Sequence, residues 1–212
     1  MHRIRTKGGV VLAVDKYIRS KLMEGTSIEK IHKTDDHIGI ASAGHVADAR
    51  QLIDFARRQA QVNHLRYGEP IGVETLTKEV TDHMQQYTQV GGARPFGVAL
   101  IIGGVENGVP RLYETDPSGT PNEWKALAIG SDRGEIQEYL EDHYTESMDL
   151  DAGIDLALEA LATVKDGSLA PENVGVATID VETEEFGVLE DENVGDYLAE
   201  LDLLASDDEE QE

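Results

Sequence analysis

The chain has 212 residues, of which 40% are hydrophobic and 5% aromatic, an ordinary load for a folded core and too apolar for a disordered chain. The charge is unusual, because 18 lysines and arginines against 42 aspartates and glutamates give a net charge of -24, which disfavours nucleic-acid binding. The absence of cysteine excludes disulfides, thiolate zinc sites and a cysteine nucleophile.

Strands followed by helices are predicted in the first half of the chain. Short apolar or β-branched runs bounded by turn residues predict strands at Val10–Val14, Ile28–His32 and His37–Ser42. Residues 33–36 are expected to join the last two strands. Apolar residues then recur every three or four positions, which predicts amphipathic helices at residues 46–60 and 73–87.

The second half repeats this order. Phe96–Gly104 is a continuous apolar run, which predicts a strand buried on both faces and is far too short to cross a bilayer. Asn107 and Gly108 tolerate the positive φ angles of a tight hairpin turn. Further strands are expected at residues 111–114, 124–129, 174–181 and 185–189, and helices at 132–144, 149–164 and 194–201. Asp149 can cap the helix that follows it, because its carboxylate accepts bonds from unpaired N–H groups.

The order of these elements predicts the fold class. Runs of strands that alternate with helices are typical of antiparallel sheets with helices packed outside, not of a doubly wound parallel sheet. We therefore predict an α+β fold of four layers. No linker divides the chain, so residues 1–202 are expected to form one domain, followed by an acidic disordered tail at 203–212. The first residues lack the apolar stretch of a signal peptide, so we expect a soluble, cytoplasmic protein.

The acidic charge has two interpretations, a surface adapted to high salt and an acidic surface that binds a partner. The carboxylates are spread along the chain, which favours salt adaptation, because a binding surface would concentrate its charge. The spread is uneven at the ends of the chain. Residues 1–33 carry eight basic and three acidic side chains, whereas residues 180–212 carry fifteen acidic ones and no lysine or arginine.

Motifs of common catalytic sites do not occur. There is no phosphate-binding loop, dinucleotide fingerprint or nucleophile elbow, and the seven histidines form no metal-binding pattern. Hydrolases with this layer order can use a threonine freed at a new N-terminus, which is often preceded by glycine. Thr26 and Thr120 follow glycines, but cleavage before Thr26 would discard the strand at Val10–Val14, and cleavage before Thr120 would destroy the fold. We therefore expect no catalytic residue, metal or cofactor.

Four segments carry a likeness to a known family, namely Gln85–Leu100, Ser27–Ile31, Ala43–Arg50 and Pro110–Gly119. Together they resemble the archaeal proteasome α subunit, and the resemblance covers roughly residues 4 to 202. It implies the αββα sandwich of N-terminal-nucleophile hydrolases, which agrees with the predicted layers. The acidic balance suggests a salt-loving archaeon.

The resemblance implies a structural role in intracellular protein degradation. In this family the β subunits carry the threonine nucleophile, whereas α subunits keep the fold without it. The α subunits form seven-membered outer rings that template β rings, restrict substrate entry and dock regulatory ATPases. The expected partners are therefore other α subunits, β subunits and a proteasome-activating ATPase, with no nucleic acid and no membrane. A threonine peptidase that uses Thr26 and a free-standing acidic interaction protein remain as alternatives.

The resemblance also implies a binding pocket for the C-terminal tail of the ATPase. Lys30 occupies the position of the lysine that lines this pocket between neighbouring α subunits, and its ammonium can pair with a terminal carboxylate. Gly44 and His45 match positions in the same pocket, although relatives carry leucine where His45 stands. The alternative for Lys30 is an exposed lysine paired with an acid such as Glu29. Arg94 is expected to be solvated or paired at a turn, not to bind a ligand.

The beginning of the printed sequence differs from the family. The N-terminal arm and most of the first strand are not in it, and only Met1–Thr6 precede the turn at residues 7–9. A wrong start site and a shortened paralogue both account for this difference. We expect the first sheet to have a short, partly unpaired edge here.

Overall fold

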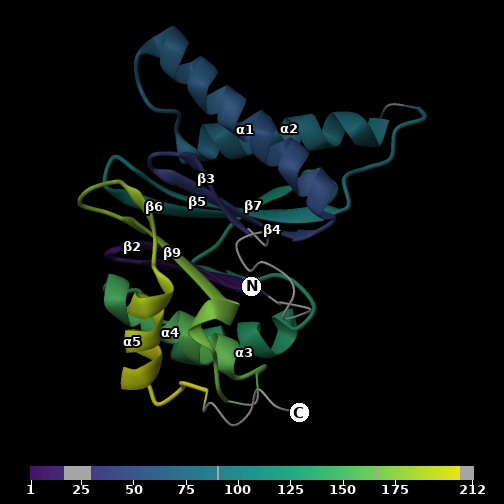
Figure 1. Ribbon diagram of the computed structural model, residues 1–212. Helices are drawn as coiled ribbons and strands as arrows, with labels where there is room; N and C mark the ends of the chain where they lie inside the picture. Colours follow the sequence, from purple (N-terminus) through teal and green to yellow (C-terminus); the bar gives the residue numbers. More distant parts are fainter. Residues whose placement is uncertain (17–29, 90, 166, 206–212) are drawn as a thin grey trace.

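Two five-stranded antiparallel sheets face each other in the computed structural model, which describes all residues except 17–29, 90, 166 and 206–212. Helices cover the outer side of both sheets (Figure 1). They are α1 (Val46–Tyr67) and α2 (Val73–Gln89) on one side, and α3 (Arg133–His143), α4 (Leu150–Ala162) and α5 (Asp191–Glu200) on the other. The predicted four-layer α+β sandwich is therefore confirmed.

Each sheet is continuous across strands that are distant in the sequence. The first sheet has the order β10-β9-β2-β1-β8, with β1 at His2–Thr6, β2 at Gly9–Asp15, β8 at Ala126–Ala128, β9 at Val174–Asp180 and β10 at Phe186–Val188. The second has the order β3-β4-β5-β6-β7, with β3 at Ile31–Asp35, β4 at Ile38–Gly44, β5 at Val98–Glu106, β6 at Val109–Thr115 and β7 at Pro121–Glu123.

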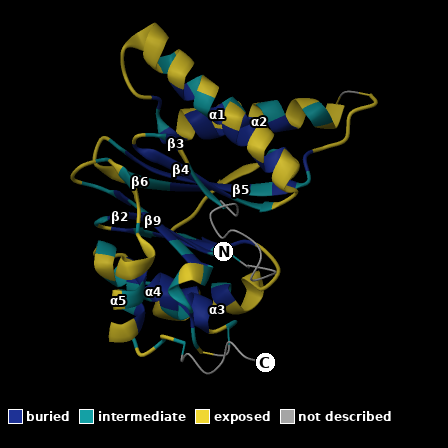
Figure 2. Cartoon of the chain, viewed as in Figure 1, coloured by how far each residue is buried: buried dark blue, intermediate teal, exposed yellow. Residues whose placement is uncertain are grey.

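The core has three apolar layers, because strand side chains alternate between the two faces of a sheet. Leu12, Ile101 and Leu112 lie between the sheets and are fully buried. A second layer joins α1 and α2 to the second sheet, and a third joins α3, α4 and α5 to the first. Figure 2 shows the buried residues concentrated in the sheets and on the inner faces of the helices.

Local sequence signals predicted one turn and one helix cap correctly. Asn107 and Gly108 have φ angles of 52° and 71° in the turn between β5 and β6. Asp149 caps α4 by accepting a bond of 3.0 Å from the Ala152 N–H. At the end of the chain, the N–H of Ala205 bonds to the Leu169 carbonyl, so part of the segment expected to be a tail contacts the domain. Residues 206–212 lie outside the described residues.

The hairpin between β3 and β4 is displaced from its predicted place. Residues 28 and 29 of the strand expected at Ile28–His32 lie outside the described residues. In the structure β3 runs from Ile31 to Asp35, and the turn consists of Asp36 and His37. Asp36 bonds through its N–H to the Asp35 carboxylate, at 2.9 Å, and pairs with Lys33 at 2.7 Å. Because β3 is an edge strand, Lys33 is exposed and Asp35 is partly exposed, whereas Thr34 is buried.

The expectation of a partly unpaired edge at the start of the chain was wrong. β1 lies inside the first sheet and pairs with both β2 and β8. The charged residues of β1 do not predict a buried strand. Arg3 is nevertheless fully buried between the sheets, where it donates to the Ile101 carbonyl. The short strand β7 was also missed, because all three of its residues are exposed and it has no apolar pattern.

Candidate functional site

Lys30 and Gly44 lie at the same end of the second sheet. Lys30 immediately precedes β3, and its carbonyl accepts a bond of 3.3 Å from the Ser42 N–H of β4. Gly44 is the last residue of β4, and His45 follows it at the start of α1. The second sheet therefore brings the backbone of Lys30 close to the segment that carries Gly44 and His45.

The Lys30 side chain connects the two sheets. It is half-buried, and its ammonium donates to the backbone carbonyl of Asp15, the last residue of β2. The Asp15 carboxylate pairs in turn with Lys165 at 2.9 Å. Glu29, the acid considered as an alternative partner of Lys30, lies outside the described residues.

Gly44 allows the chain to turn sharply from β4 into α1. Its φ angle is 129°, and a Cβ atom at this position would lie 2.4 Å from the Gly97 carbonyl oxygen. A side chain is therefore excluded both by the backbone conformation and by the neighbouring strand. The His45 N–H bonds to the same Gly97 carbonyl at 2.9 Å, which fixes the beginning of the helix against the segment before β5.

Arg94 and Asp48 stabilise this corner. Two guanidinium nitrogens of Arg94 donate to the two carboxylate oxygens of Asp48 at 2.7 and 2.8 Å, and the Gly97 N–H donates to Asp48 at 2.7 Å. These bonds to the charged form lower the pKa of Asp48 to about 2, with the Arg94 bond as the largest cause. The prediction that Arg94 is solvated or paired is confirmed, whereas its partner, 46 positions away, could not be read from the sequence.

The exposed start of α1 suits an anion. Gly44 and His45 are exposed, and the His45 side chain makes no capping hydrogen bond to the helix. The first N–H groups of a helix carry partial positive charge, and the Lys30 ammonium is positive. Each of these features attracts a carboxylate, which is the ligand that the resemblance implies for these residues.

Other kinds of site find little support in the described part of the chain. No group of three or more potential ligands could hold a metal ion among the described residues. Their helices include none long and apolar enough to cross a membrane. Thr26, the alternative nucleophile, lies outside the described residues.

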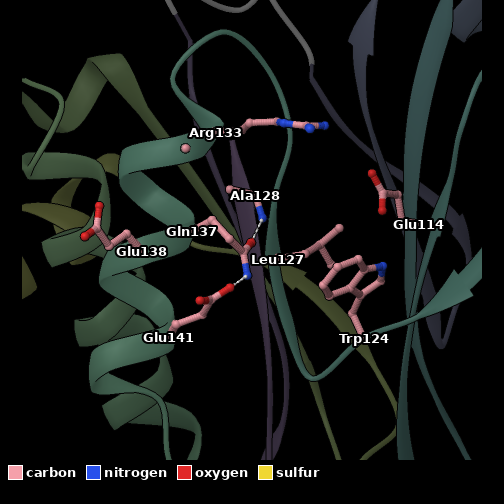
Figure 3. Close-up of a pocket in the computed structure, with 9 residues that line it drawn as sticks. Glu114, Trp124, Leu127, Ala128, Arg133, Gln137, Glu138 and Glu141 are labelled. Carbon is pink, nitrogen blue, oxygen red and sulfur yellow. Dashed lines mark hydrogen bonds between the residues drawn. The ribbon is translucent and has the colours of Figure 1, made fainter.

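A cavity of about 520 Å³ was missed by the sequence analysis. It lies between α3, the edge strand β8 and Trp124, which follows β7, and Figure 3 shows Trp124 and Glu114 on one wall opposite Gln137 of α3. Gln137 accepts a bond of 3.0 Å from the Ala128 N–H and donates to Glu141 at 3.1 Å. Trp124, the single tryptophan of the chain, was the one sequence signal for this cavity.

Comparison with known proteins identifies the family. The family model described as "Proteasome subunit" matches residues 4–179, so the chain belongs to the proteasome subunit family. Within this family, the chain is similar to α subunits of salt-loving archaea. It is 77% identical to proteasome subunit alpha 1 of Haloarcula marismortui, over 95% of this chain and 77% of the relative.

Two further relatives agree with this. The chain is 74% identical to proteasome subunit alpha of Natronomonas pharaonis, over 97% of this chain and 81% of the relative. It is 70% identical to proteasome subunit alpha 1 of Haloferax volcanii, over 98% and 82% of the two chains. These similarities support a non-catalytic α subunit, adapted to salt, and do not favour the β-type peptidase.

Proposed function

We propose that this chain forms the outer ring of a proteasome core particle together with other α subunits, seven to a ring. The ring stacks on β subunits and controls the entry of proteins that are degraded in the cytoplasm. The identity of 77% with an α subunit, over 95% of this chain, carries the proposal. The sandwich fold supports it, because helices outside two sheets leave broad outer surfaces for contacts with further subunits.

We propose further that Lys30, Gly44 and His45 receive the C-terminal carboxylate of a regulatory ATPase. The Lys30 ammonium supplies charge, and its bond to the Asp15 carbonyl holds the side chain in one place. Gly44 supplies the tight turn from β4 into the exposed start of α1. His45 adds an exposed imidazole at the mouth of the pocket.

Degradation assays with Lys30→Ala test this pocket. In particles assembled with β subunits, the variant is expected to lose ATPase-stimulated degradation of folded proteins and to keep hydrolysis of small peptides, which needs no activator. Lys165→Ala is the matched control, since the Lys165 ammonium also contacts Asp15, by pairing with the Asp15 carboxylate. Normal ATPase stimulation of Lys30→Ala would contradict the pocket, whereas failure of the unchanged chain to assemble would contradict the ring.

The mass of the purified chain tests the absence of a threonine nucleophile. Removal of the residues before Thr26 would take away β1 and β2, two internal strands of the first sheet. Neither strand could be lost without breaking the ladder to β8 and β9. An intact mass is therefore expected, and a processed chain that begins at Thr26 would overturn the non-catalytic assignment.

A further inference from the structure

The cavity beside Trp124 lies at one lateral edge of the molecule. β7 and β8 are edge strands of the two sheets, and they follow each other in the chain with Trp124 between them. Glu114 of β6 faces the inter-sheet side of the second sheet, because its neighbour Tyr113 packs toward α2. The cavity is therefore the open mouth between the sheets, closed on the third side by α3 (Figure 3).

The walls of this mouth combine an aromatic face with negative charge. Trp124 is 38% exposed, although its backbone N–H is fixed by a bond of 2.9 Å to the Leu112 carbonyl. Glu114, Glu138 and Glu141 line the cavity, although the Glu138 carboxylate points away from Trp124 in Figure 3, and Arg133 is the single cation among the lining residues. Within the described residues none of the three carboxylates forms an ion pair.

An indole beside carboxylates that form no ion pair in the described part of the chain fits a cationic side chain. Lysine and arginine are attracted to the face of tryptophan, and carboxylates add charge-assisted hydrogen bonds. Exposed tryptophan in a pocket is also typical of the residues that contribute most to protein interfaces. Small anions are disfavoured, because the excess of carboxylates repels them.

The opposite edge of the same sheet carries suitable cations. β3 is the other edge strand of the second sheet, and Lys33 on it is 50% exposed. Arg57 of α1 lies beside it and donates to the Lys33 carbonyl at 2.9 Å. In a closed ring each subunit uses one face to contact a different face of the next, so the two edges of a sheet can meet between copies.

We propose that the cavity beside Trp124 receives a cationic side chain from the β3 edge of a second copy of this chain, with Lys33 as the residue that enters. This inference rests on the proposed ring. In this contact the Lys33 ammonium exchanges its exposed partner Asp36 for the carboxylates that line the cavity. Dissolved ions screen an ion pair less inside an interface than on an exposed surface. Trp124 supplies apolar contact that persists at high salt.

Light scattering after gel filtration in molar potassium chloride tests the contact. The unchanged chain is expected to elute as an assembly of several copies, and Trp124→Ala and Glu114→Lys are expected to raise the concentration of half-assembly at least tenfold. Glu79→Lys is the matched control, because Glu79 is exposed on α2 and does not line the cavity. Circular dichroism shows whether each variant is folded, and Glu114→Gln serves as the milder substitution if Glu114→Lys is not.

A charge swap identifies the occupant. Combination of Glu114→Lys with Lys33→Glu in one chain restores an opposite-charge pair and is expected to recover assembly. Carbodiimide cross-linking provides a direct reading, because an amide between Lys33 and Glu114 can form only between copies. Within one chain three strand spacings of the sheet, about 15 Å, separate the two backbones.

The outcomes separate this inference from the proposed function. If the unchanged chain assembles and both cavity variants assemble equally well, the cavity is not the contact. If the charge swap fails to recover assembly and no Lys33 cross-link forms, the occupant is wrong. If the unchanged chain stays monomeric with or without β subunits, the ring proposal and this inference both fail.

Discussion

Replacement of Arg3 by methionine should stabilise the protein. Arg3 is fully buried in the apolar layer between the sheets, and its guanidinium makes one described bond, to the Ile101 carbonyl. Among the residues that the structure describes, its Nε and Nη2 atoms have no hydrogen-bond partner. Burial lowers the pKa of Arg3, because removal of the charged guanidinium from water is unfavourable.

The size of the effect follows from these unpaired groups. Each unsatisfied buried nitrogen of Arg3 destabilises the fold by roughly 1–3 kcal/mol. The substitution also removes the bond to Ile101, which stabilises the fold by about 1 kcal/mol. Methionine fills a similar volume without polar atoms, so a net gain of about 1–5 kcal/mol is expected. For a chain of this length 2 kcal/mol corresponds to a rise in melting temperature of roughly 4–8 °C.

Thermal unfolding at molar salt measures this difference. Arg5→Met is the matched control on the same strand, because Arg5 is partly exposed and pairs with Glu123 at 3.5 Å. A surface pair of this kind contributes about 0–1 kcal/mol, so the control should change stability little or reduce it. If Arg3→Met melts at or below the temperature of the unchanged chain, the guanidinium is better satisfied than its contacts indicate.

Two further predictions concern carboxylates. Burial, and then the charges of Glu159, Asp151 and other acids, raise the pKa of Asp155, so its ionised form weakens the fold at neutral pH. Asp155→Asn should therefore raise the melting temperature at 0.1 M salt. The rise should be smaller at 1 M salt, because the Debye length falls from about 10 to about 3 Å. Asp54→Asn is the control and should give no such rise, because Asp54 pairs with Arg57. The depressed pKa of Asp48 has the opposite sign: its stabilisation is complete above pH 3.8 and is lost as the pH falls toward about 2. Asp48→Asn should cost roughly 1–3 kcal/mol at pH 7 and progressively less in acid, and a cost that does not change between pH 6 and pH 2 would refute this reading.

Sequence patterns predicted the elements whose signal is local. The period of three and four residues placed α1 and α2, and Asn107 with Gly108 placed the hairpin, because both depend only on neighbours in the chain. The position of β1 inside the sheet was not predicted, because it depends on pairing with β2 and β8 and not on the polar residues of β1 itself.

The candidate site was predictable only in part. The resemblance singled out Lys30, whereas its bond to Asp15 joins two sheets and follows no local rule. The pair of Arg94 and Asp48, and the cavity around Trp124, bring together residues from separate elements. Such groupings depend on the register and packing of the whole sandwich, which periodicity does not encode.

The proposed ATPase-tail pocket and the proposed contact between copies both involve the β3 edge, so loss of Trp124 and loss of Lys30 should have different effects. Lys30 precedes Lys33 by three residues, about 10 Å along the edge strand β3. If the β3 edge meets the cavity of the next copy, Lys30 lies close to the boundary between copies, where a pocket for an ATPase tail needs walls from both. Loss of Trp124 should then weaken assembly and ATPase docking together. Loss of Lys30 should remove docking and leave assembly intact, since its ammonium faces Asp15 and not the neighbouring copy.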